Sequence, residues 1–477
     1  MERAESQGAV GAIAKYFKDF GVLRDNPFEY WLVQFINLCH SAGYFALLAI
    51  CTLFFTENLG LDDVWTGYVV TGMTVGTTLC LLVSGAVTDS LGIKKSLLIA
   101  IGMQTVLWAI VTTMGLWESA PGRVWIGAAA FILMAPGMAM TITVFQSSNR
   151  RFSSKRSRSA SFSLWYLMMN LGGVIAGYVI VDGVRLSWNL DNSYIFGIAA
   201  ALGALSMLAI LLVRKEGRVV GKGEDDEDGE AASEVKKLSF TQNLKLVVRQ
   251  KPFWQLVVLL ISILGVRAVF SYMYLLMPKY WERIIGEDVA MGMLQAINPI
   301  CIVVGIIITL PIISRFNVFK MLVFGAIISS FSLLVLMFPH AWFGPNMADS
   351  YFRMSVASLI ILSIGEVFWS PKLNEYSAAI APKGMEGTYL GMSMLPWFVA
   401  KTAVSFLSGH MLVKWCPEGI GEKIAEGELT FWETPEAMWM ILFIWAISGV
   451  AIAIIFRKWL TRGADLDPSN KAEKAAA

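Results

Sequence analysis

The fold is decided by one short charged turn between two long apolar runs, Gly85-Ala-Val-Thr-Asp89-Ser-Leu-Gly92-Ile-Lys94-Lys95. Glycine at position 85 permits two helices to approach closely, and Asp89 falls where a helix is expected to end. The paired lysines favour the cytoplasmic side of a membrane. A basic loop that only fixes topology would explain the lysines but not the glycines and the aspartate. Gly85, Asp89, Gly92, Lys94 and Lys95 are therefore expected to do more than fix topology.

The apolar runs on either side of this turn continue through the whole chain. Its 477 residues are 56% hydrophobic and 16% charged, with a mean hydropathy of +0.60. A soluble domain of this length does not have such a composition. Runs of about 20 apolar residues are long enough to cross a bilayer. The predicted spans are 29–56, 64–88, 95–116, 124–148, 160–182, 193–213, 253–278, 289–314, 319–339, 351–381, 385–413 and 436–456. The sequence therefore predicts an all-α, multi-pass protein of the cell or inner membrane with twelve transmembrane helices.

The distribution of basic residues sets the orientation. Five of them crowd the loop between the fourth and fifth spans, which places that loop in the cytoplasm: Arg150, Arg151, Lys155, Arg156 and Arg158. An even number of spans then puts both termini in the cytoplasm. The loop at 57–63 contains acidic residues without lysine or arginine and is expected outside.

A long acidic interval at 214–251 divides the spans into two sets of six and is expected to be a solvated cytoplasmic linker. Two motifs recur at an offset of 225 residues: Pro27-Phe28 with Pro252-Phe253, and Asp63-Val64-x-x-Gly67 with Asp288-Val289-x-x-Gly292. They indicate two pseudo-symmetric halves. The predicted organisation is a cytoplasmic segment with an interfacial helix (1–28), two six-helix halves (29–213 and 252–457) and a cytoplasmic tail (458–477).

The turn at 85–95 resembles the signature loop between the second and third helices of the major facilitator superfamily, and the resemblance implies that Gly85, Asp89, Gly92, Lys94 and Lys95 belong to a gate. We expect Asp89 to contact the cytoplasmic end of a second-half helix when the transporter opens outward. Two further stretches are similar to the fifth and tenth helices of the superfamily's proton-dependent oligopeptide transporter family: Arg158-Ser-Ala-Ser-Phe162-Ser-Leu-Trp-Tyr166-Leu-Met-Met-Asn170-Leu-Gly172 and Gly365-Glu366-Val-Phe-Trp-Ser370-Pro371. The resemblance implies the major facilitator fold, a monomer, and alternating access around a central cavity. It also implies proton-coupled symport of a small zwitterionic or peptide-like solute.

The charged motif that this family carries on its first helix is missing. The corresponding stretch reads Asn37-Leu-Cys-His40-Ser41, and Thr141 stands where the family has a lysine on its fourth helix. A peptide carboxylate would lose its expected cationic partners. The departure argues against ordinary transport of di- and tripeptides.

Five ionisable residues are expected at membrane depth, where a charge is costly unless it is paired or hydrated: His40, Arg267, Glu366, Glu375 and Lys401. At a rise of about 1.5 Å per residue, His40 and Arg267 fall near the midplane. Glu366 and Lys401 are expected at similar heights on adjacent helices, so an ion pair between them is geometrically allowed.

Each of these residues has two interpretations. Glu366 is expected to bind substrate or a proton, with a structural ion pair to Lys401 as the alternative, and for Lys401 itself we favour the structural role. Arg267 either binds an anion or partners Glu366. His40 either couples protons or is simply hydrogen-bonded. Glu375 is assigned to a gate with Lys372 or a loop cation.

Four uncharged residues complete the predicted substrate or proton site: Tyr44, Thr141, Asn170 and Trp369. The aromatic rings either pack in the core or form cavity walls. Apart from these, the sequence lacks a nucleophile–base pair, a metal-ligand cluster and a phosphate-binding glycine loop. We therefore expect no enzyme activity, cofactor, metal or nucleic-acid partner, and only solute, protons and the lipid bilayer as partners.

A rival interpretation is an exporter of amphiphilic compounds or a lipid transporter of the same superfamily. The 24 methionines favour it, because methionine-rich surfaces adapt to varied ligands. A predominantly apolar cavity would support this alternative. A non-transporting receptor or an embedded enzyme has no supporting motif.

Overall fold

The computed structural model describes residues 20–154, 156–214, 249–313, 316–380, 395–427, 429–463 and 466, and all regular elements in this part of the chain are helices. Most of the expected interfacial helix, the acidic interval and the C-terminal tail lie outside the described residues. The predicted boundaries of the two halves therefore stay a prediction.

The N-terminal helices follow the first six predicted spans. They are η1 (Phe20–Asp25), α2 (Phe28–Leu53), η2 (Phe54–Asn58), α3 (Asp63–Leu91), α4 (Ile93–Leu116), α5 (Arg123–Leu133), α6 (Ala135–Arg151), α7 (Arg158–Val174), η3 (Ile175–Val181), η4 (Gly183–Ser187) and α8 (Ser193–Leu212). The C-terminal helices are α11 (Lys251–Ser262), α12 (Leu264–Leu275), α13 (Met277–Ile285), α14 (Met291–Ile313), α15 (Val318–Val335), η5 (His340–Trp342), α16 (Met347–Ile380), α18 (Leu395–Trp415), α19 (Ile420–Glu426), η6 (Phe431–Glu433), α20 (Pro435–Ile455) and α21 (Arg457–Leu460).

Within the described residues, 10 helical segments are long and apolar enough to cross a membrane, or 11 if α11 and α12, which meet at 45°, form one bent span. The remaining predicted span corresponds to α18, which is more polar. Its polar residues include Thr402 and Ser405, and Ser405 accepts a hydrogen bond from Thr71 of α3 at 3.2 Å. A polar stripe is compatible with a membrane helix where it faces protein rather than lipid.

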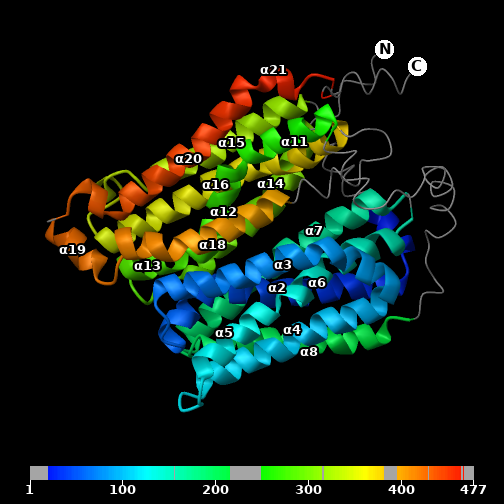
Figure 1. The fold of residues 1–477 in the computed structure, drawn as a ribbon, viewed down its shortest axis with the longest axis horizontal. Coiled ribbons are helices and arrows are strands. Elements are labelled where there is room, and N and C mark those ends of the chain that lie inside the picture. The colour runs from blue at the N-terminus through cyan, green and yellow to red at the C-terminus, as the bar shows by residue number, and fades with distance from the viewer. Residues whose placement is uncertain are drawn as a thin grey trace.

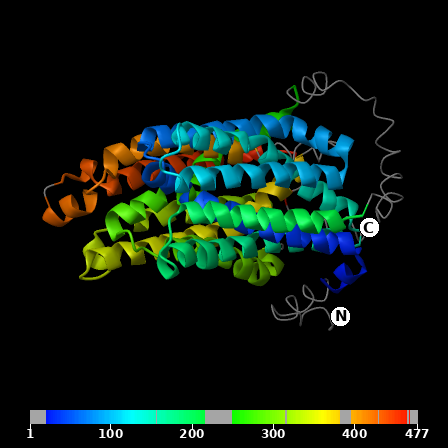
Figure 2. The same cartoon turned by 90° about the horizontal axis from the view of Figure 1, so that it is seen from below.

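The helices form two bundles that lie side by side, α2–α8 and α11–α21 (Figures 1 and 2). The bundles meet through α3 with α18, through α7 and η3 with α14, and through α2 with α12 and α13. Both bundles contain fully buried tryptophans, Trp108 in the first and Trp281 and Trp439 in the second, and all three belong to one continuous hydrophobic core. Leu82 and Leu208 are 67% and 63% exposed, as expected for side chains that face lipid.

The sequence repeat at Gly67 and Gly292 corresponds to a structural repeat. A Cβ on Gly67 would lie 2.7 Å from the carbonyl oxygen of Ser405, in the other bundle. A Cβ on Gly292 would overlap the backbone of Gly177, also in the other bundle. Each half therefore uses a glycine in the first turns of its second helix to bring its backbone against the opposite half.

Candidate functional site

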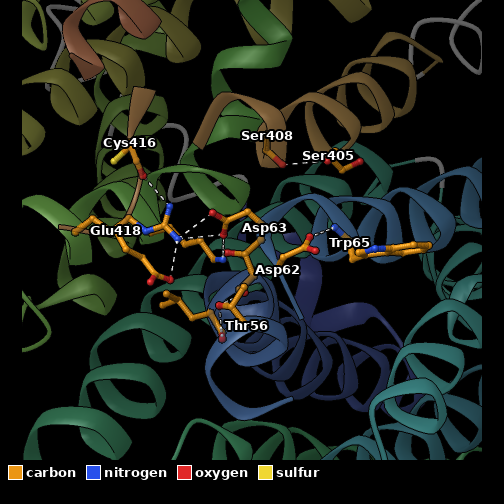
Figure 3. Close-up of polar contacts among 12 residues, drawn as sticks. Thr56, Asp62, Asp63, Trp65, Ser405, Ser408, Cys416 and Glu418 are labelled. Atoms are coloured by element: carbon orange, nitrogen blue, oxygen red, sulfur yellow. Dashed lines mark hydrogen bonds and ion pairs between the residues drawn. The ribbon is translucent and has the colours of Figure 1, made fainter. Parts of the chain in front are cut away.

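A charged network joins the two bundles at the start of α3. The Asp63 side chain, 9% exposed, forms an ion pair with Lys279 of α13 and accepts hydrogen bonds from Arg283 Nη2 at 2.9 and 3.2 Å. The neighbouring Asp62 instead caps α3, accepting from the Trp65 amide at 2.7 Å (Figure 3). The Lys279 and Arg283 side chains are only 2% and 10% exposed. Buried ion pairs of this kind hold two elements in one arrangement.

A second crossing lies between η3–η4 and the start of α14. Asp182 accepts hydrogen bonds from the backbone amides of Gly292 and Met293, each at 2.7 Å. Arg185 donates to the carbonyl oxygen of Glu287 at 3.0 Å and lies 3.5 Å from the Glu282 carboxylate. A carboxylate at the first amides of a helix is favoured by their free N–H groups.

We call these five residues, Asp63, Asp182, Arg185, Lys279 and Arg283, the outer network, because the positive-inside rule places this end outside. Arg283 is further anchored to the Cys416 carbonyl oxygen at 2.7 Å and lies 3.8 Å from Glu418, both labelled in Figure 3. The outer network was not predicted from the sequence. The pattern that could have indicated it is the acidic loop at 57–63 together with two basic residues, Lys279 and Arg283, just beyond the seventh predicted span.

The opposite end of α3 holds the predicted gate. Gly92 adopts φ 76°, a conformation that favours glycine, so α3 ends and α4 begins as the turn predicted. Lys94 donates to the carbonyl oxygens of Leu211 and Val213 at 2.9 and 2.7 Å, which satisfies the C-terminus of α8. Lys95 is exposed. The turn is thus tied to its own bundle.

One expectation for this turn differs from the structure, and another stays a prediction. No described atom lies within 4 Å of a Cβ built on Gly85, so the expected close helix approach is absent here. Asp89 is 68% exposed and pairs with Arg151 of the same bundle at 2.9 Å. The inter-bundle hydrogen bonds and ion pairs of α3 given above fall between Asp63 and Thr71, at its other end. Contact of Asp89 with the second half in an outward-open state stays a prediction.

Charged and aromatic residues from both bundles gather halfway between the two ends. Glu366 of α16 accepts a hydrogen bond from Asn298 of α14 at 2.9 Å and interacts electrostatically with Arg267 of α12. The Arg267 guanidinium carbon lies 4.5 Å from the ring centroid of Trp369 and 5.5 Å from that of Trp397. These contacts are cation–π interactions.

The first bundle contributes three residues to the same place. Tyr44 and Tyr166 lie near Tyr274 of α12, and the ring of Phe45, next to Tyr44, packs against Tyr274 with 5.9 Å between the ring centroids. Asn170 donates to the carbonyl oxygen of Tyr166 in its own helix at 2.8 Å. We call the following residues the central site: Tyr44, Tyr166, Asn170, Arg267, Tyr274, Asn298, Glu366, Trp369, Trp397 and Lys401.

The ion pair considered between Glu366 and Lys401 does not form within 4.0 Å. Lys401 instead crosses to the other bundle, where its ammonium donates to the Tyr44 hydroxyl at 2.8 Å. That the two residues lie at similar heights along their helices stays a prediction. The direction in which each side chain leaves its helix separates the two groups.

His40 and Thr141 lie inside the first bundle, on either side of Gln104. His40 Nε2 is 3.0 Å from Gln104 Oε1, and Gln104 donates to the Thr141 hydroxyl at 2.7 Å. All three are at most 8% exposed. This chain therefore has hydrogen-bonded polar side chains at positions where the resembled family has charged ones. The hydrogen bond to Gln104 and the burial of His40 support its interpretation as a hydrogen-bonded core residue.

Glu375 pairs with Lys372 one turn earlier on α16, at 2.7 Å. The Lys372 side chain is 4% exposed and that of Glu375 is 36% exposed. The predicted partnership is present, and a gating role for it stays a prediction. Asn298, Tyr274 and Trp397 were not among the predicted site residues, because nothing in their local sequence distinguishes them from packing residues.

The comparisons with known proteins agree with this architecture. The family model described as Major Facilitator Superfamily matches residues 33–403. Among curated proteins, none matches the sequence.

Three of the similar solved structures are POT family transporters. A POT family transporter in complex with 5-aminolevulinic acid has a TM-score of 0.67 at 15% identity, over 91% of this chain and 97% of that one. The POT family transporter PepTSo has a TM-score of 0.66 at 16% identity, over 91% and 99%. A peptide transporter POT in complex with sulfate has a TM-score of 0.66 at 14% identity, over 93% and 96%. At these identities the likeness is one of fold.

Proposed function

Because the chain belongs to the major facilitator superfamily, we propose that it is a proton-coupled symporter that takes up a small zwitterionic or peptide-like organic solute by alternating access. The chain is a multi-pass membrane transporter rather than an enzyme. The observation that carries the proposal is Glu366, a carboxylate held between the two bundles with Asn298 and Arg267 as neighbours.

Charge complementarity supports the choice of solute. Glu366 is placed to accept from an amine, and the cations Arg267 and Lys401 are placed to receive a carboxylate. The tyrosine and tryptophan rings around them offer apolar walls with polar edges. The similar structure that binds 5-aminolevulinic acid holds a ligand with an amine and a carboxylate.

The same carboxylate is suited to proton coupling. Its hydrogen bond to Asn298 is within one bundle, whereas Lys401 reaches across to Tyr44 of the other. A movement between the bundles therefore frees the Lys401 ammonium from Tyr44 and changes the hydration of Glu366 without breaking the Asn298 contact. Changing the hydration and hydrogen-bond partners around a carboxylate between two states alters its proton affinity, and such a change allows a proton gradient to drive a conformational cycle.

Closure at one end supports alternating access. The outer network holds the bundles together at the predicted outer end. At the predicted cytoplasmic end, Asp89 pairs within its own bundle, and no described residue of the other bundle lies within 4 Å of a Cβ on Gly85. We infer an inward-facing state, with both termini and the Arg150–Arg158 loop in the cytoplasm. The charged central site does not favour the exporter of amphiphilic compounds.

Transport into proteoliposomes tests the proposal. The purified protein is reconstituted with a pH-sensitive dye inside the vesicles, and labelled dipeptides and 5-aminolevulinic acid are offered with and without an inward proton gradient. We expect gradient-dependent accumulation with internal acidification. In Glu366→Gln, accumulation should be lost while exchange of solute across the membrane persists, since exchange moves no net protons.

The matched control is Asp349→Asn, an exposed acidic residue near the start of the same helix, which should behave as wild type. Normal accumulation by Glu366→Gln would exclude Glu366 from coupling. Equal loss of accumulation and exchange would assign it to solute binding alone. Accumulation that ignores the gradient in the wild type would contradict proton coupling.

A further inference from the structure

Two cations buried in the central site lack an ion-pair partner within 4.0 Å among the described residues, and the charge of Glu366 acts on Arg267 from a longer distance. Lys401 is 6% exposed and Arg267 is 8% exposed. Among the described residues, neither forms an ion pair within 4.0 Å. Their contacts are neutral: the Tyr44 hydroxyl at 2.8 Å for Lys401, and the Trp369 and Trp397 rings for Arg267.

The number of unused donors strengthens this observation. An ammonium has three N–H donors and a guanidinium has five. The one hydrogen bond described for Lys401 is to Tyr44, and Arg267 Nε is buried without an acceptor. Burying a charge is costly unless it is paired and hydrogen-bonded. Other buried cations in the described chain are neutralised, since Lys279 pairs with Asp63 and Lys372 with Glu375.

The two cations are arranged on one side of the site. Trp397 and Lys401 are four residues apart on α18 and therefore share a face, about 6 Å apart along the axis. The Arg267 guanidinium packs on Trp397, 5.5 Å from its centroid. The cationic groups thus lie on the α12–α18 side, and Glu366 extends from α16.

The charges of the site do not balance. With all three groups ionised, Arg267 and Lys401 contribute two positive charges and Glu366 one negative charge. A zwitterion with one amine and one carboxylate would leave a buried positive charge uncompensated. The first bundle adds no charge here, because the residues that it contributes to the central site, Tyr44, Tyr166 and Asn170, are uncharged.

We propose that the solute carries a net charge of −1, with two acidic groups and one amine. The acidic groups pair with Lys401 and Arg267, and the amine pairs with Glu366. This inference rests on the proposed transport function and refines its substrate class. Lys401 thereby becomes a specificity-determining residue, and its hydrogen bond to Tyr44 occupies the ammonium when the solute is absent.

Two isosteric dipeptides test the charge requirement. Ala-Glu and Ala-Gln differ by one carboxylate, and their binding to the purified full-length protein is measured by thermal unfolding and tryptophan fluorescence. Ala-Glu should bind at least about tenfold more tightly, as expected for one additional charge-assisted hydrogen bond. The ratio should fall to near one in Lys401→Gln and in Arg267→Gln, and Lys401→Arg should retain it.

Lys414→Gln is the matched control. Lys414 is on the same helix and also forms a cation–π contact, 4.3 Å from the Trp415 centroid, but it is exposed near the end of α18. This variant should keep the wild-type ratio. It also reports whether loss of any lysine from α18 disturbs folding.

Equal binding of the two dipeptides by the wild type would overturn the inference, as would a preference for Ala-Glu that survives in both glutamine variants of the central site. Failure of Ala-Glu, Ala-Gln and glutarate alike to stabilise the protein would also overturn it. The proposed function is judged separately. Gradient-driven uptake of a neutral zwitterion would support symport and reject the net-anionic solute.

Discussion

Replacing Asp63 with asparagine should shift the protein toward an outward-open state. Asp63 neutralises Lys279 and Arg283 across the two bundles, and all three side chains are at most 10% exposed. In Asp63→Asn, Lys279 stays buried in the closed state without its ion-pair partner, and Arg283 keeps only the longer contact with the exposed Glu418 at 3.8 Å. Opening of the outer end would hydrate them, so the substitution raises the free energy of the closed state more than that of the open state.

The magnitude follows from the contacts. Removing one partner of a buried ion pair costs about 3–5 kcal/mol. The cost is smaller here, because asparagine keeps one acceptor oxygen and Arg283 keeps the Cys416 carbonyl oxygen. We take about 2–3 kcal/mol, which at about 1.4 kcal/mol per factor of ten shifts the closed-to-open ratio roughly 30- to 140-fold.

Accessibility of Ser405 measures that shift. Ser405 is fully buried against Thr71 of the other bundle, and it becomes exposed to the outside only when α3 and α18 separate. A cysteine at Ser405, in a background without the five native cysteines, is labelled in intact cells with a membrane-impermeant thiol reagent. The labelling rate should rise by the factor given above, up to the limit of full opening.

Asp62→Asn provides the control for this experiment. Asp62 is the adjacent carboxylate but caps α3 within its own bundle, and asparagine is also a good N-cap. Its labelling rate should match that of the parent. An unchanged rate in Asp63→Asn, or equal rates in the two variants, would refute the role of the outer network.

Three further predictions concern the gate, the topology and the glycine contacts. Asp89→Asn should slow turnover in proteoliposomes without reducing expression, and wild-type turnover would remove Asp89 from the gate. A cysteine at Ser154 should react with an impermeant reagent only after permeabilisation, because the basic loop is cytoplasmic; reaction in intact cells would invert the topology. Gly292→Ala should raise labelling at Ser405, because its Cβ would overlap the Gly177 backbone, whereas Gly183→Ala, with open space around its Cβ, should not. Equal labelling in these two variants would contradict the close glycine contact.

The membrane helices were predictable because their signal is local. Apolar length located the spans, and Gly92 between Asp89 and Lys94 located a turn that requires positive φ. The repeat of Gly67 and Gly292 correctly indicated related halves, although its role in bringing the bundles together emerged only from the structure.

The pairing of side chains was not predictable in the same way. Their expected depth in the membrane predicted that Glu366 and Lys401 could pair. The rotation of each helix about its axis instead directs Lys401 to Tyr44. Asp63 meets Lys279 across more than 200 residues of sequence, and neither local sequence specifies the other. The sequence indicated this contact only through acidic and basic residues that were expected at the same face of the membrane. The polar residues of α18 were explained only by the structure, in which Ser405 contacts Thr71 of α3.

In alternating access, the two bundles move as rigid bodies, so that one end of the protein opens when the other end closes. Distances between spin labels test it directly, with one pair at the exposed outer residues Glu118 and Glu422 and another at the exposed residues Ser90 and Lys320 near the predicted cytoplasmic end. On introducing Asp63→Asn, the Glu118–Glu422 distance should lengthen while the Ser90–Lys320 distance shortens. A change of both distances in the same direction, or of neither, would contradict alternating access in this protein.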